Sequence, residues 1–215
     1  MKKYLLVLLA VVMMIPSMVS AAEHKVVPTF KLQKTTQTME GIKMSFPQVV
    51  EYKDAKVMHT VNAEMAKMLV QTADFLHKNN PGATGKVDYK VTLNHSTLLS
   101  VLFNGNFNIK DTNGKTEKLN IKNGMTFNNQ GVRVMPKDIS AINKISNKPD
   151  MFGADYLNAK VKAAAAAGKL TLKPGFKSVD ARAVDFYMDD TTNIFAIFAP
   201  GAVSPMEKGS VVVAL

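Results

Sequence analysis

Residues 54–82 read DAKVMHTVNAEMAKMLVQTADFLHKNNPG, and this stretch decides the first half of the fold. Apolar side chains recur every three or four residues from about Asp54 to His77, which predicts an amphipathic helix of about five or six turns. Asn79-Asn80-Pro81-Gly82 predicts the end of the helix. Glu51 and Asp54 precede it, where acidic side chains stabilise a helix N-terminus. The apolar positions are Val57, Val61, Met65, Met68 or Leu69, Thr72 and Leu76.

Alternating apolar and polar residues on both sides of this helix predict half-buried strands. Before it, residues 42–46 form one strand that ends at Pro47, and residues 22–40 form an extended or edge-strand lead-in. After it, residues 87–94 and 99–109 form two more strands, with a bulge expected at Asn104-Gly105.

Two Asn-Gly steps predict hairpin turns, one at Asp111–Gly114 and one at Asn123-Gly124. A short strand with Leu119 and Ile121 lies between them. The expected product is an antiparallel meander.

The second half mixes helices with short strands. Met135–Asp138 opens a short helix, and Pro149-Asp150 starts a longer one that runs into Ala163–Ala167 and ends at Gly168. Residues 183–188 and 194–198 predict a hairpin around a polar turn, and residues 211–214 predict a terminal strand.

This order of elements is typical of an α+β fold with antiparallel sheets. A long amphipathic helix lies in the first half, and further helices precede a C-terminal hairpin. We expect four segments: a signal peptide at 1–21, the lead-in at 22–40, and two α+β halves at 41–130 and 131–215.

The first residues have the features of a secretory signal peptide. Lys2 and Lys3 precede an apolar run from Leu5 to Ile15, and Val19-Ser20-Ala21 supplies the small residues that a signal peptidase requires. Cleavage is expected after Ala21, with Ala22 as an alternative. The mature protein is then exported to the periplasm, the cell-wall space or the medium, without a stable membrane anchor.

The chain is basic, with a formal net charge of +10 that falls to +8 when Lys2 and Lys3 leave with the signal peptide. An exported basic protein is attracted to anionic cell-wall polymers, and export makes nucleic acid an unsuitable partner. The lysines are scattered along the sequence, so a solvated face and a specific anion site both remain open. They include Lys86, Lys90, Lys110, Lys115, Lys118 and Lys122.

No residue pattern supports catalysis, a metal site or a cofactor. The chain has no cysteine, and its four histidines lack ligand spacing. Gly-x-Ser-x-Gly and Ser-x-x-Lys are absent. Asp189-Asp190 begins a polar sequence, Asp-Asp-Thr-Thr-Asn, that is typical of a hairpin turn and not of paired catalytic carboxylates. We therefore expect a protein that is not an enzyme.

Several stretches resemble a bacterial extracytoplasmic domain of unknown function. This domain occurs in RsiV-type anti-sigma factors and in front of the catalytic domain of PdaC-type peptidoglycan deacetylases. The likeness of the first half, 41–130, to the opening of that domain rests on Ser45-Phe46-Pro47-Gln48-Val49, Val57, Val61-Asn62 and Leu99-Ser100-Val101. The likeness of the second half, 131–215, to its close rests on residues 184–188, 194–198, 199–205 and Gly209.

The sequence departs from the family pattern in places. Gly201 and Met206 stand where the family often has tyrosines, and its Gly-Ala-His is not recognisable between Phe103 and Asp111. No sigma-binding segment, transmembrane helix or deacetylase domain is recognisable. The resemblance therefore implies the binding module alone.

The resemblance implies a secreted, non-catalytic envelope module that recognises a wall glycan or an envelope protein. The alternative is an inhibitor or receptor of a wall-lytic enzyme such as lysozyme. Common lysozymes are basic, so that interface needs an acidic patch, for which Asp185, Asp189 and Asp190 are the candidates. The predicted contact surface is the loop from Pro200 to Gly209, with Pro200, Gly201, Ala202, Val203, Met206 and Gly209 as its contact residues.

Overall fold

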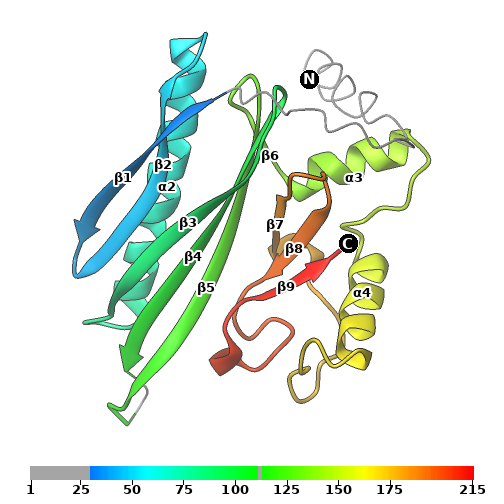
Figure 1. The fold of residues 1–215 in the computed structure, drawn as a ribbon. Helices are drawn as coiled ribbons and strands as arrows, with labels where there is room; N and C mark the ends of the chain where they lie inside the picture. The colour runs from blue at the N-terminus through cyan, green and yellow to red at the C-terminus, as the bar shows by residue number, and fades with distance from the viewer. Residues whose placement is uncertain (1–29, 111–112) are drawn as a thin grey trace.

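The computed structural model of the chain describes residues 30–110 and 113–215 (Figure 1). It has the predicted α+β fold, with a six-stranded sheet in the order β1-β2-β3-β4-β5-β6 and a three-stranded sheet in the order β7-β8-β9. The predicted signal peptide and its cleavage site at Ala21 lie outside the described residues. Along the residues that are described, no helix is both long and apolar enough to cross a membrane.

The strands of the large sheet are β1 (Lys31–Met39), β2 (Ile42–Glu51), β3 (Thr84–Asn94), β4 (Leu98–Lys110), β5 (Thr116–Asn128) and β6 (Arg133–Val134). The small sheet contains β7 (Val184–Met188), β8 (Ile194–Phe198) and β9 (Val211–Ala214). The helices of the described residues are α2 (Ala55–Asn79), α3 (Pro136–Ile145) and α4 (Ala154–Ala166), with short 3₁₀ turns η1 (Ala181–Ala183) and η2 (Met206–Lys208).

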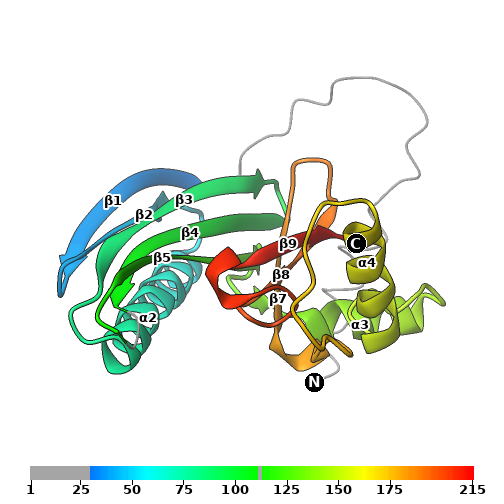
Figure 2. The ribbon, with the colours of Figure 1, turned by 90° about the horizontal axis from the view of Figure 1, so that it is seen from below.

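Helix α2 connects β2 to β3, which pair in parallel, while the other neighbouring strands of both sheets are antiparallel. The parallel pair makes the large sheet mixed, because a helical crossover returns the chain in the same direction. The sheet curls over α2, which covers one of its faces (Figure 2).

The apolar stripe of α2 is buried against that face as predicted. Val61, Met65 and Leu69 are fully buried, and each contributes about 1.5–3 kcal/mol by leaving water. Ala73 is buried instead of Thr72, whose hydroxyl donates back to the Met68 carbonyl at 2.9 Å. The full buried stripe is Val57, Val61, Met65, Leu69, Ala73 and Leu76.

Of the two acids that precede α2, Asp54 is the N-cap. Its carboxylate accepts from the backbone N–H of Lys56 at 2.8 Å and of Val57 at 3.4 Å. The prediction for Glu51 is wrong, because this residue ends β2 and accepts from the Lys31 ammonium at 2.8 Å instead.

The predicted turn at Asn123-Gly124 is wrong, because β5 runs through it without interruption. A Cβ at Gly124 would lie 1.9 Å from the carbonyl oxygen of Phe186 in β7. The glycine is therefore needed for close approach of the second sheet, and not for a turn.

Two smaller strand predictions also differ from the structure. Asn104-Gly105 lies in regular pairing, and the bulge of this hairpin falls between Val91 and Leu93 of β3. Pro47 lies inside β2 opposite Lys34 of β1. Because β2 pairs with β3 only up to Met44, the missing N–H of proline is tolerated there.

The described residues form two hydrophobic clusters. The first lies between α2 and the large sheet. The second lies under α4 and the small sheet, and it takes Leu93, Leu98 and Val134 from strands of the large sheet. Helix α4 begins at Ala154, later than the predicted Pro149-Asp150, because the Asp150 carboxylate forms a turn by accepting from the Phe152 N–H at 3.1 Å. The proposed boundary between halves at residue 130 stays a prediction.

Candidate functional site

The face of the large sheet that points away from α2 is basic. Six lysines of β2, β3, β4 and β5 lie on it, because each is next in sequence to residues that pack into the first cluster on the opposite face. All are exposed except Lys122, which is half-buried. We call this set the lysine face: Lys43, Lys86, Lys90, Lys110, Lys118 and Lys122. Five of the six lysines that are scattered through residues 86–122 thus share one face.

Amide side chains fill the centre of the lysine face. Asn104, Asn106 and Asn108 alternate along β4, and the Asn120 side chain of β5 donates to the Asn104 and Asn106 side-chain oxygens at 2.8 and 3.1 Å. Among the described residues of β3, β4 and β5, one acid lies on this face, Asp88, which pairs with Lys86 at 3.0 Å. The face is therefore rich in hydrogen-bonding groups and strongly positive.

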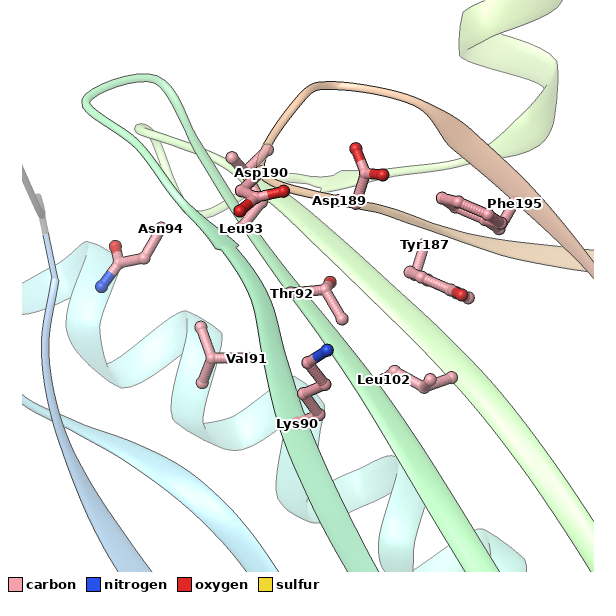
Figure 3. A pocket seen from close by; sticks show the side chains of 10 residues that line it. All are labelled: Lys90, Val91, Thr92, Leu93, Asn94, Leu102, Tyr187, Asp189, Asp190 and Phe195. Carbon is pink, nitrogen blue, oxygen red and sulfur yellow. The ribbon is translucent and has the colours of Figure 1, made fainter. Parts of the chain in front are cut away.

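A groove of about 550 Å³ opens where the small sheet meets β3 and β4 (Figure 3). Residues 90–94 of β3 line one side, and Leu102 of β4 lines the floor. Tyr187 and Phe195 line the other side, and Asp189 and Asp190 stand at one end. We call it the aromatic groove. Lys90 belongs to both the groove and the lysine face, so the two surfaces are continuous.

The aromatic wall is a cross-strand pair. Tyr187 of β7 lies opposite Phe195 of β8, and their rings stack with centroids 4.8 Å apart and an angle of 6° between their planes. Burial, together with the nearby charge of Asp189, raises the pKa of Tyr187. The hydroxyl therefore stays protonated and can donate a hydrogen bond at neutral pH.

Asp189 organises the turn between β7 and β8, as the polar turn sequence predicted. Its carboxylate accepts from the backbone N–H and the hydroxyl of Thr191, and from the backbone N–H and the side-chain amide of Asn193, at 2.8–3.1 Å. Slight burial opposes ionisation, but these donors lower the pKa of Asp189 below its usual value. Asp189 is thus a fixed negative charge and a poor proton donor, and Asp190 beside it is exposed.

Asp185 does not join these two acids in a surface patch, so that part of the prediction is wrong. Its carboxylate lies between the two sheets, where it accepts from the Gly124 N–H at 2.9 Å and lies 3.5 Å from the Arg133 guanidinium. Burial raises the pKa of Asp185, while Arg133 and the Gly124 and Phe186 N–H groups oppose that shift.

The predicted contact loop, 200–209, packs against the rest of the second half along much of its length. The Gly201 carbonyl accepts from the Lys173 ammonium at 2.8 Å, and Val203 is fully buried. Gly209 lies so close to β5 that a Cβ there would be 2.6 Å from the Asn120 carbonyl oxygen. Pro200 and Ala202 are half-buried, and Met206 is 59% exposed. A contact role for this loop stays a prediction.

Sequence reasoning missed the aromatic pair and the amides on β4. Predicting that Tyr187 stacks on Phe195 requires the register of the β7–β8 hairpin, which the sequence alone does not give. The amides left a signal, since asparagine is depleted in strands and yet appears at three alternate positions from 104 to 108. Within the described ranges, no group of three or more His, Asp or Glu side chains could hold a metal ion.

Comparison with known proteins yields a likeness in fold. No family model matches the chain, and no curated protein matches it. A solved DUF3298 family protein from Bacteroides fragilis has a TM-score of 0.54 and 13% identity, over 88% of this chain and 92% of that one. The chain shares its fold with that protein. A DUF3298 family protein from Pseudomonas aeruginosa has a TM-score of 0.49 and 10% identity, over 89% of this chain and 91% of that one.

Proposed function

We propose that the chain is an exported, non-catalytic module of the bacterial cell envelope that binds an anionic wall glycan through the lysine face. The observation that carries this proposal is the gathering of six lysines on the side of the sheet away from α2, where five of them are exposed beside the small sheet. The predicted signal peptide and the resemblance to RsiV- and PdaC-type domains support an envelope location.

The spacing of the lysines suits a repeating polymer. Lys86 and Lys90 on β3, and Lys118 and Lys122 on β5, are each four residues apart, which is about 13 Å along a strand. The two strands are separated by β4, so the pairs lie roughly 10 Å apart. A chain with regularly spaced carboxylates or phosphates can contact several of these ammonium groups at once, while the amides of β4 bind its hydroxyl and amide groups.

The test is co-sedimentation of the mature protein with peptidoglycan sacculi over a salt series. The variant Lys43→Gln/Lys118→Gln removes two charges from the lysine face, and Lys67→Gln/Lys162→Gln removes two exposed helical charges elsewhere. A lysine beside an anionic surface contributes about 1 kcal/mol at low salt, so the first variant should bind up to roughly 30-fold more weakly. The second variant should bind like the wild type.

Equal binding by the two variants would mean loose adhesion by net charge alone. Absence of pelleting at any salt concentration would reject the wall as partner. An envelope protein, beginning with lytic enzymes, would then be the partner to seek.

A further inference from the structure

The aromatic groove has the opposite charge to the surface on which it opens. Asp189 and Asp190 stand at its end, and neither carboxylate forms an ion pair with another described residue. All the donors to Asp189 come from its own turn, and none of them is charged. A basic protein thus presents two carboxylates, neither with an ion-pair partner among the described residues, beside its most positive face.

The aromatic wall favours the same kind of ligand group. Tyr187 and Phe195 are half-buried and line the groove, and aromatic rings attract ammonium groups. Two carboxylates with two rings form a cation-binding arrangement, and the protonated Tyr187 hydroxyl adds a hydrogen-bonding group.

Lys90 limits what that ligand can be. Its ammonium lines the groove on the β3 side and would repel a ligand that carries only positive charge. A ligand with an anionic group near Lys90 and an ammonium near Asp190 satisfies both ends.

From this charge pattern we infer that the aromatic groove binds a free ammonium group carried by the wall polymer, while the lysine face binds the anionic groups of the same polymer. This inference rests on the proposed function and names the ligand as zwitterionic. Uncross-linked peptidoglycan has this chemistry, because its peptides carry free amines as well as carboxylates.

The experiment compares native sacculi with sacculi whose free amines have been acetylated, which removes ammonium groups and leaves the carboxylates. The wild type should bind acetylated sacculi about threefold more weakly, as for loss of an exposed ion pair. Simple attraction between net charges predicts the reverse, since acetylation makes the polymer more anionic.

Asp190→Asn identifies the groove as the origin of this effect. Asp190 is exposed and forms no hydrogen bond with another described residue, so the variant should fold normally, as a thermal melt would verify. It should bind acetylated sacculi at least as strongly as native sacculi, and it should bind native sacculi more weakly than the wild type does. Asp74→Asn, an exposed site on α2, removes the same charge as a control and should behave like the wild type.

Unchanged or stronger binding of the wild type to acetylated sacculi would overturn the inference and leave the proposed function intact. Equal binding of Asp190→Asn and Asp74→Asn to native and to acetylated sacculi would likewise overturn the inference and leave the proposed function intact. Absence of binding to both preparations would overturn the inference together with the proposed function.

Discussion

Gly124→Ala should separate the two sheets and strongly destabilise the protein. The new Cβ would lie 1.9 Å from the Phe186 carbonyl oxygen and 2.4 Å from its carbonyl carbon. Real Cβ atoms essentially never approach closer than 3.0 Å, so the backbones of β5 and β7 must move apart by about 1 Å. That movement strains the bond from the Gly124 N–H to Asp185, at 2.9 Å, and the bond from the Met188 N–H to Ser100, at 3.0 Å.

Overpacking costs about 1–3 kcal/mol, and a buried donor left without its acceptor costs about 1–3 kcal/mol more. We therefore expect a loss of about 3–5 kcal/mol in the free energy of unfolding, measured by urea denaturation, and a fall in Tm of roughly 10 °C. The control is Gly114→Ala, where a Cβ meets nothing within 4 Å and the φ of +78° costs about 1 kcal/mol. If Gly124→Ala loses no more stability than this control, close approach of the sheets is not what requires the glycine.

Three further changes test the packing. Asp54→Ala removes the N-cap of α2 and should cost about 1 kcal/mol in urea denaturation, whereas Asp54→Asn, which can still cap, should cost less. Ser100→Ala removes a buried hydroxyl that joins the Thr126 hydroxyl, at 2.9 Å, to the Met188 N–H, and it should cost about 1–3 kcal/mol. The control is Thr92→Ala, which removes a half-buried hydroxyl that donates to the Ser100 carbonyl at 3.1 Å; a smaller loss for Ser100→Ala than for this control would contradict the expectation. Asp185→Asn should alter the pH dependence of the free energy of unfolding. Burial raises the folded pKa of Asp185 above the unfolded value, so wild-type stability falls as pH rises from about 4 through the folded pKa. The variant lacks this loss. The stability of Asp185→Asn relative to wild type should therefore increase between pH 3 and pH 7, and a difference that stays constant or shrinks would refute the assignment.

Helix α2 and the β7–β8 turn were predictable because their signals are local. The stripe from Val57 to Leu76 repeats with the helical period, and the donors to Asp189 lie within four residues of it. The structural role of Gly124 was not predictable, because a side chain at this position would collide with the backbone of Phe186, which lies 62 positions away in the sequence. In the sequence alone, Asn-Gly is a stronger sign of a turn than of close packing.

The same error affects the prediction of the lysine face. With a turn predicted at Asn123-Gly124, β5 is only a short strand around Leu119 and Ile121; alternation places Lys118 and Lys122 on one side of it, but does not align that side with Lys86 and Lys90. The register of β4 against β5, in which Asn104 lies opposite Lys122 and Asn108 opposite Lys118, supplies this alignment. Strand register alone would not have predicted the aromatic groove, because its two sides come from different sheets.

The second hydrophobic cluster has a consequence for the order of folding. Leu93, Leu98 and Val134 belong to the large sheet, yet they form part of the wall against which α4 and the small sheet pack. The N-terminal half buries its own cluster under α2, but the C-terminal half needs a surface that the N-terminal half provides. Folding should therefore proceed from the N-terminus to the C-terminus, in the direction of synthesis. Residues 131–215 alone should show no cooperative thermal transition, while residues 30–134 should retain one.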